Sequence, residues 1–299
     1  MRTFINAGLV LLLSCGLLCA QADLRKRSYM QRGVVRYHVD SATVLANDPR
    51  PLSQAITAVS EEYGWVVHFE EPPYQSNLEL VDDTAPQWRA AHPNEKGVRI
   101  AAGGAFHTEY PEKPNLATSA AEEERVLKKI VMDYNQSGNP GKYGLRRLPD
   151  DSFLIAGTSV KDDTGADVPV SAILDTPISF PGETRSVVQT ITLITRELSE
   201  ATGIRVLMGT MPINLFFQSQ VAIGGENVPA RSLLQQALAG TKRELHWVLY
   251  YDPDRPSYGL NVLFAQLVGY DSSGNRTTTP IDRLPDKQTP KRPAASKNL

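Results

Sequence analysis

Cysteine is almost absent from this sequence. Its two cysteines, Cys15 and Cys19, both lie in the first 22 residues, which we predict to be an export signal. The mature chain would then contain no cysteine, and this excludes disulfide frameworks, cysteine nucleophiles, cysteine-ligated zinc and iron–sulfur clusters. A chain of 299 residues, 41% of them hydrophobic, can instead be stabilised by a buried core.

The sequence also lacks an excess of either charge and long apolar runs. It has 31 Lys and Arg residues against 33 Asp and Glu residues, a formal net charge of −2. Such a chain has no global positive field to attract nucleic acid or an anionic membrane. After the leading segment, no apolar run approaches the ~20 residues of a membrane-spanning helix. We therefore predict a soluble mature protein with no nucleic-acid partner and no integral membrane span.

The first 22 residues have the layout of a secretory signal. Arg2 precedes an apolar run, and Ala20-Gln21-Ala22 places small residues at the two positions that a signal peptidase reads. We expect cleavage after Ala22 and a periplasmic or secreted mature chain. Lipoprotein processing at Cys15 is the alternative, although Leu13 is bulky for its position in that motif.

The rest of the sequence contains two halves with similar patterns. Each half has an amphipathic helix, a glycine that ends it and an apolar strand: Leu52–Tyr63, Gly64 and Trp65–Phe69, then Val187–Ala201, Gly203 and Ile204–Met208. Each half continues with a strand that runs into glycines, a second helix and a strand–turn–strand unit. The strands before glycines are Val98–Gly104 and Val221–Gly225. We interpret these patterns as a tandem duplication of one α+β unit.

The predicted boundaries follow from composition. They are a signal peptide at 1–22, a flexible basic lead-in at 23–33, a first module at 34–159 with an insert at 72–97, a polar linker at 160–168, a second module at 169–270 and a tail at 271–299. The tail has almost no apolar residues, so we expect it to be disordered.

The order strand–helix–strand–strand–helix–strand–strand resembles the secretin and TonB short N-terminal (STN) domain. The residues that carry this resemblance are Arg50-Pro51-Leu52 through Phe69 and Val228-Pro229-Ala230 through Tyr251. The resemblance implies two tandem small α/β-sandwich modules of the α+β class, and a role in docking partners in a bacterial envelope. The insert departs from the family pattern, and neither a secretin ring domain nor an outer-membrane barrel follows the second module.

No recognised catalytic or metal-binding pattern occurs in the sequence. Its five histidines are scattered without the spacing of metal ligands. His68 and His246 alternate with apolar neighbours in strands, so we expect each to face solvent or a partner. Glu70 and Glu71 are adjacent, an arrangement that usually leaves both carboxylates solvated. We therefore predict no catalytic residue, no metal and no cofactor.

The candidate binding residues are aromatic side chains and one arginine. Long inserts in compact domains are often functional, and Tyr, Trp and Arg are favoured at recognition surfaces. We predict partner binding by Tyr74, Trp88, Arg89, Trp247 and Tyr250. The leading interpretation is an exported, non-enzymatic envelope protein that binds other proteins, with open sheet edges available for strand addition. The alternatives are a small-molecule or glycan binder with an aromatic cleft between the modules and, less favoured, a hydrolase.

Overall fold

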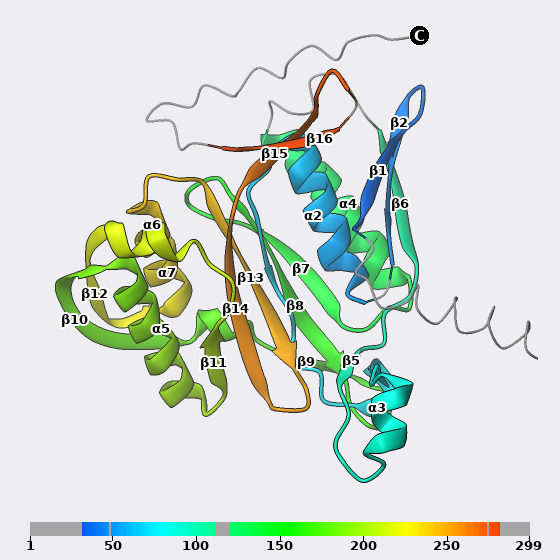
Figure 1. Ribbon diagram of the computed structural model, residues 1–299, viewed down its shortest axis with the longest axis horizontal. Helices are drawn as coiled ribbons and strands as arrows, with labels where there is room; N and C mark the ends of the chain where they lie inside the picture. The colour runs from blue at the N-terminus through cyan, green and yellow to red at the C-terminus, as the bar shows by residue number, and fades with distance from the viewer. Residues whose placement is uncertain (1–31, 48, 112–119, 274, 282–299) are drawn as a thin grey trace, which may run out of the picture. The chain divides into compact units, whose positions relative to one another are not determined.

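The structure is a computed structural model that describes residues 32–47, 49–111, 120–273 and 275–281 (Figure 1). The predicted signal peptide and nearly all of the lead-in lie outside these residues. The fold class is α+β, as predicted, with helices and several sheets. In the part of the chain that is described, no helix is both long and apolar enough to cross a membrane.

The first half of the described chain contains two helices, two sheets and an insert. Its main elements are β1 (Val34–Tyr37), β2 (Ser41–Ala46), α2 (Pro51–Tyr63), β3 (Val67–Glu70), β6 (Phe106–Pro111), α4 (Ala120–Gln136), β7 (Lys142–Arg147) and β8 (Phe153–Lys161). The insert between β3 and β6 contains η1 (Asn77–Glu79), β4 (Leu80–Asp82), α3 (Pro86–Ala91) and β5 (Arg99–Ala101).

The second half has the same main elements with a different insertion. It contains β9 (Asp167–Pro169), η3 (Ile173–Asp175), β10 (Pro177–Ser186), α5 (Val187–Thr202), β11 (Arg205–Met208), α6 (Ile213–Gln218), β12 (Gln220–Pro229), α7 (Ala230–Ala239), β13 (Leu245–Asp252) and β14 (Ser257–Phe264). The pair β15 (Gln266–Tyr270) and β16 (Arg276–Pro280) follows.

Strand pairing repeats between the halves. In the first half, β2 pairs with β6 antiparallel, β3 with β8 parallel, and β7 with β8 antiparallel. In the second half, the same three relations join β10 to β12, β11 to β14, and β13 to β14. In both halves, two helices lie between a small antiparallel sheet and a three-stranded sheet. The order strand–helix–strand–strand–helix–strand–strand can thus be traced in each half.

Helix ends follow from local sequence. Helix α2 begins at Pro51 and ends at Gly64, whose φ of 73° is accessible to glycine without strain. Helix α5 begins with a capping box between Ser186 and Gln189 and ends at Gly203, with φ of 70°. These signals are local, so the sequence pattern locates both helices.

The two three-stranded sheets join into one. Strand β13 pairs parallel with β3, and this produces the strand order β11-β14-β13-β3-β8-β7. Because β11 and β3 then run in opposite directions, the second half is turned over relative to the first. Helices α2 and α4 consequently cover one face of the sheet and α5 and α7 the other (Figure 1). Strand β3 lies at the junction and is buried on both faces.

The predicted linker at 160–168 is wrong. Val160 and Lys161 are the last residues of β8, while Asp167 and Val168 begin β9, which pairs with β8 across a tight turn. Val160 is 1% exposed and packs in the core of the second half. From Gly33 onward the described chain forms one compact unit, so residues 34–159 and 169–270 are not separate bodies.

Two further predictions need correction. Strand β5 pairs with β4 inside the insert, so the counterpart of β12 is β6 and not the Val98–Gly104 segment. The insert therefore extends beyond residue 97. Part of the predicted disordered tail is also ordered, because β16 pairs with β15 and Arg276 forms an ion pair with Glu61 of α2. Residues 282–299 lie outside the described part.

Candidate functional site

Two of the predicted binding residues are core residues. Tyr74 is 4% exposed, and its hydroxyl hydrogen-bonds with that of Tyr143 at 2.8 Å. Trp247 is fully buried, stacks on His68 with ring centroids 3.4 Å apart, and donates from Nε1 to Glu70 at 3.0 Å. Neither side chain can contact a partner in this conformation, so their predicted role at the surface is wrong.

The other three predicted residues lie on two separate surfaces. Tyr250 is half-buried, its hydroxyl lies 2.7 Å from Ser53 Oγ, and the Arg50 guanidinium lies 4.6 Å from its ring centre. Trp88 and Arg89 are on α3 in the insert. The predicted aromatic cleft between the modules, with Tyr74, Trp88, Trp247 and Tyr250 as its lining, is therefore not formed.

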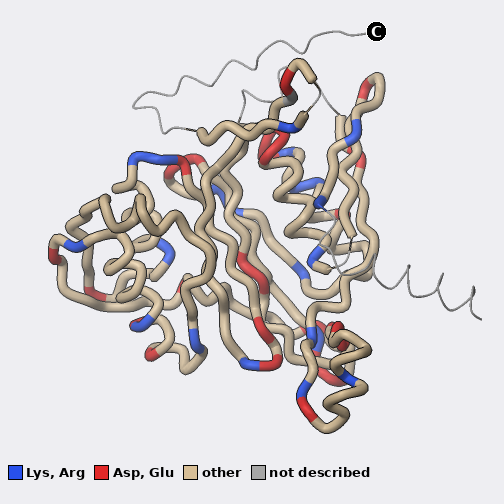
Figure 2. The backbone as a smooth tube through the Cα atoms, viewed as in Figure 1, with Lys and Arg blue, Asp and Glu red and all other residues tan. Residues whose placement is uncertain are grey.

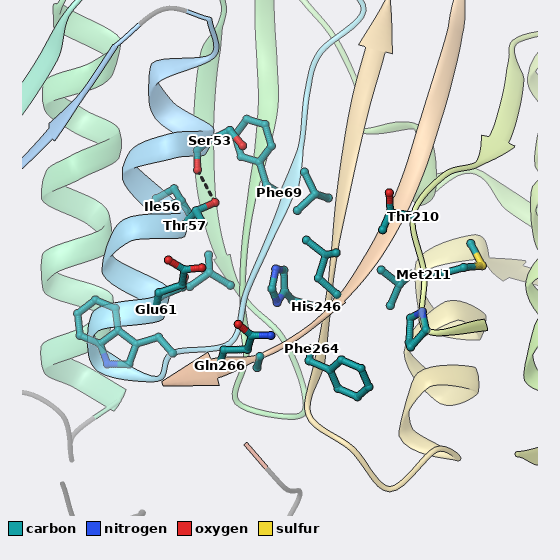
Figure 3. A pocket seen from close by; sticks show the side chains of 18 residues that line it. Ser53, Ile56, Thr57, Glu61, Phe69, Thr210, Met211, His246, Phe264 and Gln266 are labelled. Atoms are coloured by element: carbon teal, nitrogen blue, oxygen red, sulfur yellow. Dashed lines mark hydrogen bonds between the residues drawn. The ribbon is translucent and has the colours of Figure 1, made fainter. Parts of the chain in front are cut away.

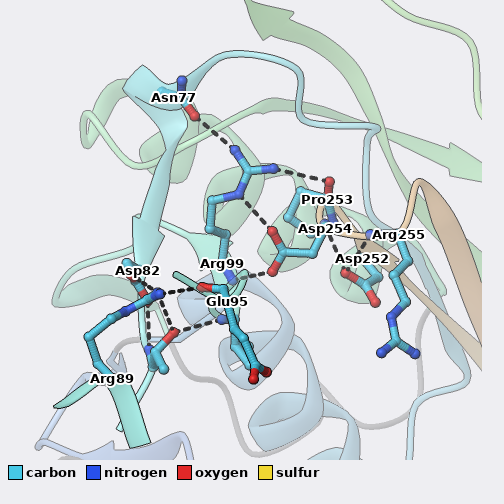
Figure 4. A network of polar contacts seen from close by, with 11 residues as sticks. Asn77, Asp82, Arg89, Glu95, Arg99, Asp252, Pro253, Asp254 and Arg255 are labelled. Atoms are coloured by element: carbon cyan, nitrogen blue, oxygen red, sulfur yellow. Dashed lines mark hydrogen bonds and ion pairs between the residues drawn. The ribbon is translucent and has the colours of Figure 1, made fainter. Parts of the chain in front are cut away.

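Polar contacts hold the insert in place (Figure 4). Arg89 forms an ion pair with Asp82 at 2.5 Å and donates to the carbonyl of Glu95 at 2.7 Å. Arg99 forms an ion pair at 2.7 Å with Asp254 in the turn between β13 and β14. Arg89 thus stabilises the insert itself. Trp88 remains 37% exposed and stacks on the ring of a neighbouring histidine.

Two buried carboxylates join the halves. Figure 2 shows acidic positions within the central strands, where most residues are uncharged. Glu70 pairs with Arg231 of α7 at 2.8 Å, and Glu71 pairs with Arg50 at 2.9 Å and accepts from the Tyr251 amide. Both carboxylates are at most 3% exposed, so the expectation that they are solvated is wrong. Burial raises the pKa of Glu71. Buried charges of this kind must be paired, because an unpaired charge carries a large desolvation penalty.

His68 belongs to the same junction. It is 2% exposed, its Nδ1 accepts from the Trp247 amide at 3.2 Å, and its Nε2 lies 3.1 Å from Ser152 Oγ. Burial lowers the pKa of His68 well below its usual value. The predicted exposure of His68 is therefore wrong, because the second half covers this face of β3. Both ring nitrogens are already engaged within the protein.

A pocket of about 360 Å³ lies between α2 of the first half and the β13–β14 hairpin of the second (Figure 3). Ile56 and Thr57 line it from α2, Val248 and Leu263 from the hairpin, and Met211 from the segment after β11. Most of the lining is apolar. The two walls come from residues almost 200 positions apart, so no local sequence pattern predicts the pocket.

The polar side chains of the pocket carry little available charge. Glu61 forms an ion pair with Arg276 at 2.5 Å. The hydroxyl of Thr57 donates to the Ser53 carbonyl at 2.9 Å. His246 points into the pocket (Figure 3), and burial lowers its pKa to about 4. At neutral pH the pocket therefore presents an uncharged imidazole and no unpaired ionic group from its lining.

The sheet of the second half also has an uncovered area, which we call the open sheet face. It is formed by Leu207 on β11 and by Gly259, Asn261 and Leu263 on β14. Leu207 is 46% exposed and Leu263 is 38% exposed, and a Cβ built on Gly259 would meet no atom within 4 Å. The open sheet face adjoins the pocket at Leu263.

The equivalent face of the first half is completely covered. When β3 and β8 are aligned with β11 and β14, His68 has the position equivalent to Leu207, and Leu154 has the position equivalent to Gly259. His68 is 2% exposed and Leu154 is 0% exposed, because the second half packs over them. The repeated fold thus has one filled and one open version of the same surface.

The outer edge of β11 is available for further pairing. In the described sheet, β11 is an end strand with β14 as its partner. The Gly209 amide donates to Leu260 of β14, so by strand alternation the Met208 amide points away from β14. On this outer side, the Val206 amide donates to Ser199 Oγ at 2.9 Å. The β11 edge is thus open beyond Val206.

Comparisons with known proteins add no functional information. No family model, no curated protein and no solved structure matches this chain. Among the described residues, no group of three or more histidine, cysteine or acidic side chains could hold a metal ion. The STN resemblance therefore remains a prediction from element order.

Proposed function

We propose that this protein is an exported, non-enzymatic binding protein whose partner is another protein, bound at the β11 edge and the open sheet face. Export is proposed from the leading sequence that ends at Ala22. The single observation that supports binding here is that the equivalent edge and face of the first half are occupied. Strand β13 pairs with the edge of β3, and the second half buries His68 and Leu154.

The internal junction indicates how a partner would bind. Strand β13 lies parallel to β3 and contributes both backbone hydrogen bonds and side chains that cover the sheet. A partner strand parallel to β11 would make the same type of contact, with main-chain bonds providing affinity and apolar side chains covering Leu207. Exposed strand edges readily accept such strands. From the STN resemblance we expect the partner to be a protein of the bacterial envelope.

A site-specific photocrosslinker tests this proposal. With p-benzoylphenylalanine at Leu207, the exported protein should form one discrete protein adduct in cells, whereas a probe at Met132 should form none. Met132 is 50% exposed on α4 and so provides a matched exposed position. Equal adducts from both positions, or none from Leu207, would contradict the proposal.

A proline variant identifies strand addition as the mode of binding. Met208→Pro removes the outward amide of β11, and proline is tolerated at such an edge position. We expect this variant to lose the Leu207 adduct while Met208→Ala keeps it. If both variants keep the adduct, the partner contacts the open sheet face without pairing to β11.

The insert offers a second candidate surface. Trp88 is partly exposed on α3, a helix that has no buried residue. Trp88→Ala should weaken partner capture without lowering the melting temperature if this ring is a binding anchor. A lower melting temperature with unchanged capture would instead identify Trp88 as a residue that stabilises the insert.

A further inference from the structure

The pocket between α2 and the β13–β14 hairpin has the size and lining of a small-molecule site. Its volume of about 360 Å³ falls within the ~300–1,000 Å³ range of ligand pockets, which are mostly apolar with a few polar groups. The walls come from both halves, and Figure 3 shows Ile56 and Thr57 on one side of the pocket and Met211 and Phe264 on the other.

The charge of the lining restricts the ligand. Glu61 is paired with Arg276, and His246 is uncharged at neutral pH because its pKa is about 4. A phosphate, carboxylate or sulfonate would have to leave water without finding a free cation in the pocket. Such a transfer is strongly unfavourable. The pocket therefore selects against anions, while its apolar walls favour rings or hydrocarbon.

His246 and Ser60 are two of the polar lining residues that are available to a ligand. The ring of His246 makes no side-chain hydrogen bond to any described residue, and its neutral form offers one donor and one acceptor. Ser60, on the pocket side of α2, has a buried hydroxyl without a hydrogen-bond partner in the described part of the chain. A buried hydroxyl without a hydrogen-bond partner is unfavourable, so it calls for an explanation.

We propose that this pocket binds an uncharged, mainly apolar small molecule that carries a neutral hydrogen-bonding group. This inference does not depend on the proposed protein partner. The occupant would lie against Ile56, Val248 and Leu263, and its polar group would reach His246.

Two fluorescent probes that differ mainly in charge test the proposal on the full chain. N-phenyl-1-naphthylamine is neutral, whereas 8-anilinonaphthalene-1-sulfonate has the same ring system with an added sulfonate. We expect saturable, one-site binding of the neutral probe and at least tenfold weaker binding of the anionic probe. Absence of saturable binding, or equal affinity for the two probes, would overturn the proposal.

A matched pair of variants locates the bound probe. Thr57 and Thr192 are both exposed helical residues whose hydroxyls donate to the carbonyl four positions earlier, but Thr57 alone of the two lines the pocket. Thr57→Trp should reduce neutral-probe affinity at least tenfold, and Thr192→Trp should leave it unchanged. Leu263→Trp blocks the pocket from the opposite wall and should act like Thr57→Trp.

The outcomes separate this proposal from the proposed function. Thr57→Trp should keep the Leu207 crosslink, because Leu207 lies on β11 away from α2. Loss of probe binding with an intact crosslink supports a pocket separate from the partner contact. Equal probe binding by Thr57→Trp and Thr192→Trp in folded protein would show that the probe binds elsewhere, and would contradict the pocket assignment whatever the crosslink shows.

Discussion

The two halves of this protein pair their strands in the same way but differ in what covers the far face of each three-stranded sheet. In the first half, that face carries His68, Glu70 and Leu154, all at most 2% exposed beneath the second half. In the second half, the corresponding face carries Leu207 and Gly259 and remains open. The comparison shows that each repeat of the fold has a sheet face that its own helices do not cover. The second half covers the face of the first, whereas the equivalent face of the second half is left open, and we propose that a partner covers it.

The largest expected effect on stability comes from breaking the buried ion pair between Glu70 and Arg231. Arg231→Met keeps an apolar stem but leaves Glu70 buried without its cation, and loss of one partner from a buried pair destabilises by about 3–5 kcal/mol. Urea unfolding should show this loss. Arg125→Met removes an exposed pair with Glu122 on α4 and should lower stability by at most about 0.5 kcal/mol. Similar losses in both variants would mean that the buried pair has no special role.

The next effect contrasts two equivalent positions in the sheet. Leu154→Ala empties a fully buried site and should lower the free energy of unfolding by about 2–5 kcal/mol. Gly259→Ala adds a methyl group in open space and should change stability by less than about 0.5 kcal/mol. Thermal and urea unfolding measure both. A large destabilisation by Gly259→Ala would show that the open sheet face is not open in solution.

The smallest of the three effects is a pH dependence of the unfolding free energy, which arises from His68 where the two halves meet. The folded pKa of His68 lies well below 6.5, so the unfolded chain binds the proton more readily and stability falls as pH drops below about 6.5. At pH 5 a histidine that stays neutral destabilises the fold by about 2 kcal/mol relative to pH 7.5. His246 acts in the same direction over the range from 6.5 down to about 4. Glu71 acts in the opposite sense, because burial favours its protonated form.

Comparison of variants isolates the contribution of His68. His68→Gln should lower overall stability but reduce the difference in unfolding free energy between pH 7.5 and pH 5. His92→Gln, at a half-buried position in the insert and away from the junction, should keep the wild-type difference. An unchanged pH difference in His68→Gln would exclude this histidine as the source.

Local patterns in the sequence predict much of the fold but little of the site. Helix α2 with Gly64 and helix α5 with Gly203 were predictable because a helix and its stop are encoded within about 15 neighbouring residues. The α+β class and the repeated order of elements follow from the same signals. The prediction of a linker was wrong because the short polar turn between β8 and β9 has the composition of a linker. Composition alone does not indicate that the flanking strands pair.

The site was not predictable because its partners are distant in sequence. Glu70 resembles a solvated acid until Arg231, 161 positions away, is placed beside it. Trp247 has the residue type of a binding anchor, but the first half supplies the Glu70 carboxylate that satisfies its indole. The pocket likewise forms only when α2 meets β13 and β14. Burial and pairing across the junction thus reversed the interpretations that residue type alone suggested.

Hydrogen exchange of two equivalent strands measures most directly whether the first half has a filled edge and face while the second half has open ones. Amides of β3, over Val67–Glu70, should exchange only through global unfolding, with protection close to the full unfolding free energy. Amides of β11, over Arg205–Met208, should exchange faster through local fluctuations, with the outward Met208 amide the least protected. Equal protection of the two strands in the isolated protein would show that the edge and face of the second half are not open.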